Sequence, residues 1–241
     1  MGHYYNPNIV TDGLILSLDA SNPRSYPGSG TIIYDLSGRD AHGTINGTIS
    51  YVGAGSTSYW NFATASSANF ISSTKSQAYV DCTIIFYPDF SLNSNASLVG
   101  LIAASNDATN TDKSMRFGGA NGTGPWTVKA SAGLNGDDWG NTSTTYYING
   151  RSVADGSSLN NGWNVLGAYR TNQSTFPSSF SYFLGTEGFS SAVRDFQGRI
   201  AMCLMYNRQL SAAEHAKNYH ALKRRFGFTA ASSGGGLEIP Q

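Results

Sequence analysis

Residues 195–227 read DFQGRIAMCLMYNRQLSAAEHAKNYHALKRRFG, and this stretch decides the fold. Its first part, RIAMCLMYN (199–207), is an apolar run of the length expected for a buried strand. Ser211 and Glu214 then have the Ser-x-x-Glu spacing of a capping box, in which each side chain bonds a backbone amide of the other residue. The sequence therefore predicts a strand that leads directly into one capped C-terminal α-helix.

The predicted helix, 212–226, is amphipathic. Its apolar stripe falls at i, i+4, i+7 and i+11 and consists of His215, Tyr219, Leu222 and Phe226. The basic residues lie off this stripe: Lys217, Lys223, Arg224 and Arg225. The last three oppose the negative end of the helix dipole, and Gly227 is a suitable residue to end the helix. We interpret the helix as a lid on a β structure; the alternative is a basic patch that binds a partner.

The rest of the chain has the pattern of an all-β domain. Short β-branched and aromatic runs alternate with turn residues, which predicts an antiparallel β-sandwich or jelly roll. Asn-Gly turn signals occur at 46–47, 121–122, 135–136, 149–150 and 161–162. The predicted strands are 14–20, 31–36, 44–51, 68–72, 78–88, 97–105, 126–131, 144–150, 163–171, 181–186 and 199–207.

The run AYVDCTIIFYP (78–88) alternates only weakly between apolar and polar residues. One set of positions is suited to the core: Val80, Cys82, Ile84 and Phe86. The opposite set is suited to a half-covered face: Tyr79, Asp81, Thr83, Ile85 and Tyr87. This pattern favours a curved sheet whose outer face is partly overlaid by another layer.

Composition excludes several classes of protein. The 241 residues carry 15 basic and 15 acidic groups, and only 12% are charged, about half the usual share of roughly 25%. A neutral balance argues against a nucleic-acid partner, which would require a basic surface. No apolar run approaches the roughly 20 residues needed for membrane insertion. The N-terminus lacks the pattern of a signal peptide.

The two cysteines, Cys82 and Cys203, lie in separate strand-like runs. Two cysteines without a nearby histidine pair do not make a zinc site. We interpret them as buried free thiols; a disulfide between two strands is the alternative.

The two ends of the predicted domain resemble concanavalin A-like, laminin-G-like jelly-roll domains. The closing pattern of those domains is matched by Phe196, Gly198, Ile200, Tyr206, Asn207, Leu210, Ser211 and Glu214. Segments 13–48 and 146–153 resemble their opening strands and their Asn-Gly hairpin. The resemblance implies a jelly-roll domain over 13–228, preceded by an extended arm (1–12). A flexible Gly/Ser-rich tail (229–241) follows, whose LEIPQ end is alternatively a docking peptide.

The opening LDASNPRSYPGSGT…YDLSG is similar to domains of structural proteins in tailed bacteriophages. This resemblance implies a non-enzymatic virion protein that decorates a head or belongs to a fibre or tail, assembled in the host cytoplasm. Other virion proteins and further copies of the chain would be its partners. The alternative is a carbohydrate-binding lectin module with no tie to a virion, and the two readings are compatible.

Hydrolase activity of the kind found among concanavalin A-like enzymes is not expected. A retaining glycosidase needs two carboxyl groups about 5–5.5 Å apart. The chain has three glutamates, Glu187, Glu214 and Glu238, and none has an acidic partner on a predicted strand. No cofactor is therefore expected.

One loop, 134–147, carries the candidate binding residues Asp137, Asp138, Trp139 and Asn141. An exposed tryptophan can stack on a sugar ring, and its polar neighbours can bond hydroxyl groups of a cell-surface polysaccharide. The same oxygen ligands suit calcium. A plain polar hairpin is the third interpretation. The other tryptophans are expected in the core: Trp60, Trp126 and Trp163.

Overall fold

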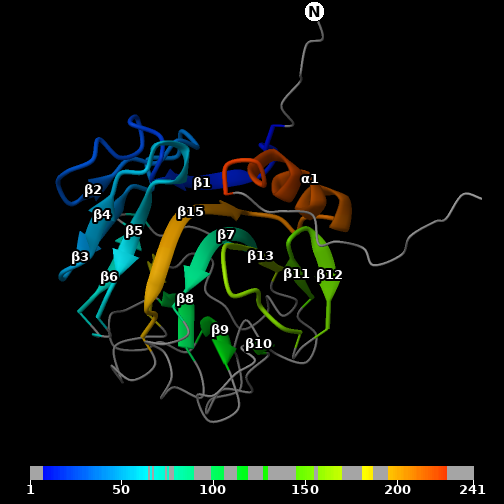
Figure 1. Ribbon diagram of the computed structural model, residues 1–241. Coiled ribbons are helices and arrows are strands. Elements are labelled where there is room, and N and C mark those ends of the chain that lie inside the picture. Colours follow the sequence, from blue (N-terminus) through cyan, green and yellow to red (C-terminus); the bar gives the residue numbers. More distant parts are fainter. Residues whose placement is uncertain are drawn as a thin grey trace, which may run out of the picture.

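The computed structural model describes most of the chain between Asn8 and Phe226. The described residues are 8–64, 66, 68–73, 75, 79–89, 99–105, 113–118, 127–129, 145–154, 157–169, 181–186 and 195–226. They form two antiparallel sheets and one α-helix, α1 (Ala212–Leu222), which confirms the predicted β-sandwich with a C-terminal helix (Figure 1).

The two sheets have different strand orders. The eight-stranded sheet has the order β12-β11-β13-β7-β15-β5-β4, and β1 also pairs with β15. Its strands are β1 (Leu14–Asp19), β4 (Ser50–Val52), β5 (Tyr59–Phe62), β7 (Asp81–Pro88), β11 (Tyr146–Ile148), β12 (Arg151–Val153), β13 (Asn164–Tyr169) and β15 (Gly198–Tyr206). The seven-stranded sheet has the order β10-β9-β8-β14-β6-β3-β2. Its strands are β2 (Ile32–Ile33), β3 (Gly43–Asn46), β6 (Phe70–Ser73), β8 (Val99–Ser105), β9 (Lys113–Gly118), β10 (Thr127–Lys129) and β14 (Ser181–Leu184). A short 3₁₀ helix, η1 (Gly55–Thr57), precedes β5.

The main core lies between the two sheets. Trp60 and Phe86 from the eight-stranded sheet and Ile71 and Tyr182 from the seven-stranded sheet are fully buried in one cluster. Burial of such large side chains removes apolar area from water and supplies the main driving force for sandwich formation. The core thus fixes which face of each strand points outward.

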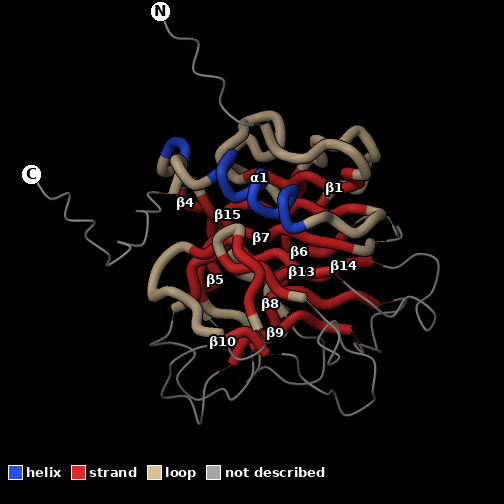
Figure 2. The backbone as a smooth tube through the Cα atoms, turned by 90° about the vertical axis from the view of Figure 1, so that its right-hand side faces the viewer, coloured by secondary structure: helices blue, strands red, loops and turns tan. Residues whose placement is uncertain are grey.

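Helix α1 adds a third layer over part of the outer face of the eight-stranded sheet (Figures 1 and 2). A second apolar cluster joins Leu222 of α1 to Ile85 of β7, Val165 of β13 and Leu204 of β15. Because β15 has the core on one side and α1 on the other, eight of its nine residues are buried. The predicted overlay on this sheet is confirmed, and it explains the weak alternation of the strand sequences.

Two predicted strands differ from the observed ones near the N-terminus. The segment 44–51 is divided between β3 and β4, which belong to different sheets, because Gly47 turns the chain with a φ of +73°. The 46–47 turn therefore crosses the sandwich and is not a hairpin. The segment 31–36 is a strand only at β2, since the Asp35 carboxylate accepts hydrogen bonds from the backbone of Ser37 and Ala41 and holds a turn. Strands β5, β9 and β12 lie outside the predicted strand ranges, although β12 belongs to the hairpin implied by the resemblance over 146–153.

The Asn-Gly turn at 149–150 behaves as predicted. Asn149 and Gly150 have φ values of +52° and +78°, and they connect β11 to β12 as an antiparallel hairpin. Positive φ at both positions is the geometry that an Asn-Gly hairpin turn requires. Tyr79, by contrast, was predicted on the outer face but is buried in the main core, because β7 begins two residues later at Asp81.

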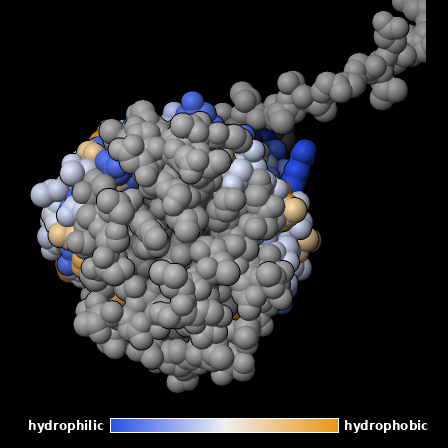
Figure 3. All heavy atoms as spheres, turned by 90° about the horizontal axis from the view of Figure 1, so that it is seen from below, coloured by the Kyte–Doolittle hydropathy of each residue, from blue (hydrophilic) through white to orange (hydrophobic). Residues whose placement is uncertain are grey.

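The described residues visible at the margin of Figure 3 are mainly hydrophilic or near neutral, with isolated hydrophobic ones. Over all described residues, the large hydrophobic side chains that are exposed are Ile32 and Tyr34. Both lie at β2, the edge strand of the seven-stranded sheet.

Candidate functional site

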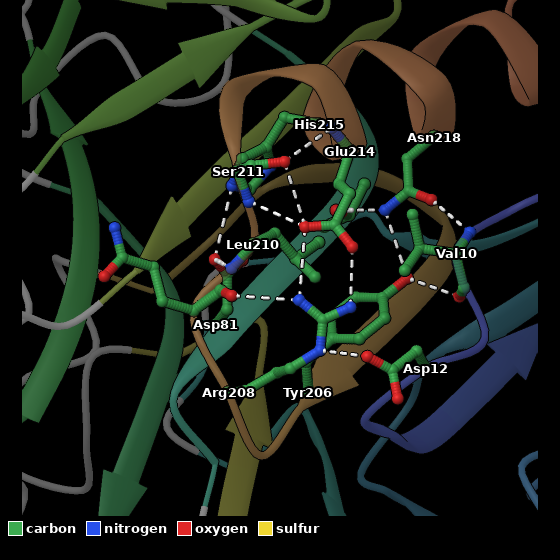
Figure 4. Close-up of polar contacts among 12 residues, drawn as sticks. Val10, Asp12, Asp81, Tyr206, Arg208, Leu210, Ser211, Glu214, His215 and Asn218 are labelled. Atoms are coloured by element: carbon green, nitrogen blue, oxygen red, sulfur yellow. Dashed lines mark hydrogen bonds and ion pairs between the residues drawn. The ribbon is translucent and has the colours of Figure 1, made fainter.

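The polar contacts that hold α1 on the eight-stranded sheet include those of Asp81 (Figure 4). The Asp81 carboxylate is fully buried, accepts a hydrogen bond from the Leu210 backbone N–H at 2.9 Å and lies 3.2 Å from His215 Nε2. Burial raises the pKa of this carboxyl, and the contact with His215 opposes that rise. The His215 ring stacks on Tyr147 at 3.9 Å and occupies space that the absent side chain of Gly167 leaves open. This arrangement attaches the first turn of α1 to the sheet.

Asn218 forms the second attachment, and sequence reasoning missed it. Its side-chain nitrogen donates to Tyr206 Oη at 3.0 Å and Thr83 Oγ1 at 3.2 Å, and its oxygen accepts from the Val10 backbone N–H at 2.8 Å. Tyr206 in turn donates to the Val10 carbonyl at 3.1 Å. Val10, expected in an extended arm, is therefore buried against α1; residues 1–7 and 227–241 lie outside the described residues. The signal was available, because Asn218 lies three residues after His215 on the same helix face.

The predicted capping box at Ser211 and Glu214 is confirmed. Arg208 adds two hydrogen bonds to the Glu214 carboxylate, at 2.6 and 3.1 Å, and pairs with Asp12 at 2.7 Å. The hydrogen bond from Arg208, followed by that from the Ser211 backbone, lowers the pKa of Glu214 to about 2. Glu214 is thus a structural carboxylate that joins the helix start to the N-terminal segment.

This network predicts a specific acid response. Because the pKa of folded Glu214 lies below its ordinary value of 4.5, its contribution is fully present above pH 4.5 and is lost as the pH falls towards 2. We expect Glu214→Gln to lower the free energy of unfolding by about 1 kcal/mol at pH 7, the usual value of a helix cap. The difference between wild type and variant should shrink as the pH falls from 5 to 2. Urea unfolding at several pH values measures this, and a pH-independent difference would contradict it.

The C-terminal end of α1 corrects two predictions. The helix ends at Leu222 and not at 226, and residues 223–226 form turns. Arg225, expected to act on the helix dipole, forms a two-bond ion pair with Asp19 at 2.8 and 2.9 Å and donates to the Ser56 carbonyl. These tertiary contacts hold the chain away from the helical path. The predicted helix-ending residue, Gly227, lies outside the described residues.

The loop with the predicted binding residues Asp137, Asp138, Trp139 and Asn141 lies outside the described residues. Glycan and calcium binding by that loop stay predictions. Among the residues that the structure describes, no group of three His, Cys, Asp or Glu side chains converges as a metal site. Cys82 and Cys203 are present as buried free thiols, and burial raises the pKa of both.

A partly exposed aromatic cluster lies on the outer face of the eight-stranded sheet. The guanidinium of Arg199 on β15 lies between the rings of Tyr59 on β5 and Tyr87 on β7, with its carbon 5.0 and 4.8 Å from the two ring centroids. Trp163, just before β13, contacts both tyrosines edge-on at 5.9 and 5.7 Å. We call these four residues the Arg199 platform. All four side chains are partly exposed. The separations between them lie within the ranges of cation–π and aromatic pairs.

The Arg199 platform lies beside the part of the sheet that α1 covers. Trp163 packs on Phe226, which follows α1, at 4.9 Å. The register places Tyr87 and Asn61 directly across from Arg199 on its two neighbouring strands, and Asn61 is also partly exposed. The platform and the adjacent Asn61 therefore offer two tyrosines, a tryptophan, a guanidinium and an amide on one sheet face.

Sequence reasoning found only fragments of this platform. Tyr87 was predicted on the outer face, which is confirmed. Trp60 was predicted in the core and is fully buried, whereas Trp163, also predicted in the core, is only partly buried and packs against the second apolar cluster. Trp126 lies outside the described residues. The available signal was strand alternation, which places Arg199 on the face opposite its buried neighbour Ile200.

Within the described residues, no helix combines the length and the apolar character that a bilayer crossing requires.

No protein-family model matches the sequence, and no curated protein matches it either. Several solved structures share the fold. Trypanosoma rangeli sialidase in complex with the inhibitor DANA aligns with 13% identity and a TM-score of 0.52, over 90% of this chain and 35% of the sialidase chain. A mutant of the same sialidase displaying trans-sialidase activity aligns with 14% identity and a TM-score of 0.52, over 92% of this chain and 35% of that chain.

A weaker likeness is to domain 4 of AbnA, a GH43 extracellular arabinanase from Geobacillus stearothermophilus, in complex with arabinotriose. Its identity is 15% and its TM-score is 0.46, over 86% of this chain and 98% of that domain. This chain spans about a third of the sialidase chains. At these identities the likeness to the sialidases shows the fold alone, and that fold is a β-sandwich.

Proposed function

We propose that the protein is a non-catalytic carbohydrate-binding β-sandwich module that holds a polysaccharide on the Arg199 platform. The observation that carries this proposal is the open row of Asn61, Arg199 and Tyr87 on one sheet face, with Tyr59 and Trp163 beside it. Aromatic rings are large, rigid surfaces on which the C–H face of a sugar can stack. The amide and the guanidinium supply donors for sugar hydroxyl groups.

We propose that the module is non-catalytic because structural contacts already occupy several of its acidic side chains. Glu214 forms the capping box with Ser211 and is bonded by Arg208. Asp19 pairs with Arg225, and Asp81 accepts a hydrogen bond from the Leu210 amide. None of these carboxylates lies in the Arg199 platform. The few glutamates of the sequence support the same conclusion, since glycoside hydrolysis commonly uses two acidic side chains.

Tyr87→Ala and Trp163→Ala test the platform. Loss of an aromatic side chain at the centre of a binding surface commonly costs at least about 2 kcal/mol, or roughly 30-fold in affinity. We expect each variant to show a loss of this size on the polysaccharides that the wild-type protein retains in affinity gel electrophoresis. Tyr34→Ala is the matched control, because Tyr34 is an exposed tyrosine that directly follows β2 of the other sheet. Thermal melts check that each variant remains folded.

Trp139→Ala distinguishes the two candidate sites of the module. If this variant abolishes polysaccharide binding while Tyr87→Ala and Trp163→Ala bind normally, the binding site is the 134–147 loop and the platform assignment is wrong. Retention of no polysaccharide by the wild-type protein would overturn the carbohydrate-binding function itself.

Attachment to a tailed-phage virion is a second candidate function, favoured by the resemblance of LDASNPRSYPGSGT…YDLSG (18–38) to phage structural domains. The two functions are compatible, because a module on a virion surface can also bind host sugars. Purified virions that contain the chain at a fixed high copy number would support this role. Detection of the chain only as a free protein would count against it.

A further inference from the structure

The cation of the Arg199 platform is free to bind a ligand. Of the ion pairs formed by the described residues, none includes Arg199, and no hydrogen bond from its guanidinium to another described residue occurs. The neighbouring cation, Arg225, packs on Phe226 but is neutralised by Asp19. Arg199 is therefore a partly exposed charge whose five N–H donors are held in place by two flanking tyrosine rings.

We infer that the Arg199 platform selects polysaccharides that carry carboxylates, such as polymers of uronic acids; this inference rests on the proposed carbohydrate-binding function. A guanidinium is planar and matches a carboxylate with two parallel hydrogen bonds. The guanidinium carbon lies over the rings of Tyr59 and Tyr87. The N–H groups that would form such a pair point outward in the plane of the guanidinium, at its edge. A sugar ring on Trp163 would bring its own carboxylate to that edge.

The charge of the platform favours a polymer with one carboxylate per sugar over a densely sulfated one. The chain as a whole has no net charge, so it has no overall positive charge to attract polyanions without selectivity. Within the platform itself, Arg199 is the basic residue among four. One guanidinium is suited to one carboxylate at a defined position, whereas a sulfated polymer would need several cations in a row.

The test compares polygalacturonate with its methyl ester, which has the same backbone without the charge, by affinity gel electrophoresis and calorimetry. Dextran and dextran sulfate serve as further probes. A charge-assisted pair contributes roughly 10- to 100-fold in affinity, so wild-type protein should prefer polygalacturonate to the ester by this factor. Arg199→Gln should remove the preference, and Arg199→Lys should restore part of it, because lysine keeps the charge without the planar fork. Arg24→Gln is the control, since Arg24 is an exposed arginine outside the platform.

The outcomes distinguish a failure of the inference from a failure of the proposed function. Equal binding of polygalacturonate and its ester would overturn the inference and leave the proposed function standing. Failure of the wild-type protein to bind any of the four polymers would count against both the inference and the proposed carbohydrate-binding function. Tighter binding of dextran sulfate, with equal losses in Arg199→Gln and Arg24→Gln, would indicate non-specific attraction and would also overturn the inference. Thermal melts of the arginine variants separate lost binding from lost folding.

Discussion

Replacing Asp81 with alanine is expected to lower the free energy of unfolding by about 2–4 kcal/mol, because a buried donor that loses its acceptor costs about 1–3 kcal/mol and the contact with His215 is lost as well. Asp81 is fully buried, and its carboxylate is the acceptor for the Leu210 amide and the neighbour of His215. Without it, the Leu210 backbone N–H would remain buried with no acceptor, and the His215 imidazole would lose its 3.2 Å contact with a carboxylate. Leu210 directly precedes the N-cap of α1, and His215 lies in its first turns. The lost stability should therefore come from weaker attachment of the helix to the sheet.

Equilibrium urea unfolding, followed by tryptophan fluorescence, measures the effect of Asp81→Ala. Asp81→Asn is the matched variant, since its amide oxygen can still accept from the Leu210 amide; it should lose less than half as much stability. A loss below about 1 kcal/mol in Asp81→Ala, the level of a single ordinary hydrogen bond, would show that the pair does not hold the helix.

Gly167→Ala is expected to cost about 2–3 kcal/mol, because a methyl group at this position would overpack a filled site. The new Cβ would lie 2.8 Å from Cε1 of His215 and even closer to Nδ1, although the backbone of β13 itself accepts alanine. The imidazole is also stacked on Tyr147, so it cannot move aside without shifting α1. The helix and the strand should therefore compete for the same space.

A double-mutant cycle isolates this competition. His215→Ala should be destabilising by itself, but adding Gly167→Ala to it should cost much less than adding Gly167→Ala to the wild-type protein, since the clash is then absent. Gly162→Ala is the control: no atom lies within 4 Å of its added Cβ, and we expect a change within about 0.5 kcal/mol. Additive effects of Gly167→Ala and His215→Ala would contradict the observed packing.

The two halves of the Asp81 attachment were each present in the sequence. Alternation placed Asp81 on the outer face of its strand, and helical periodicity placed His215 on the buried stripe of its helix. Both placements are confirmed. Their pairing could not be predicted, because periodicity specifies a face but does not specify which residue of another element lies opposite.

The Arg199 platform shows the same limit more strongly. Its residues come from four separate segments, and each looks ordinary in its own context: Tyr59 and Trp163 border strands, while Tyr87 and Arg199 alternate within them. Only the neighbouring order of β5, β15 and β7 makes them one surface. The predicted loop site was easier to notice because its four residues are close in sequence.

The sequence by itself determined the β-rich class, the Asn149–Gly150 hairpin and the capped start of α1, since each depends on contacts between residues at most a few positions apart. Tertiary structure alone decided where α1 ends, which sheet receives β3 and β4, and which outward side chains remain exposed. The physical reason is that these features depend on burial and charge pairing between distant segments, as when Asp19 pairs with Arg225. Local propensity specifies the elements, whereas packing between them selects the surface that is left for a ligand.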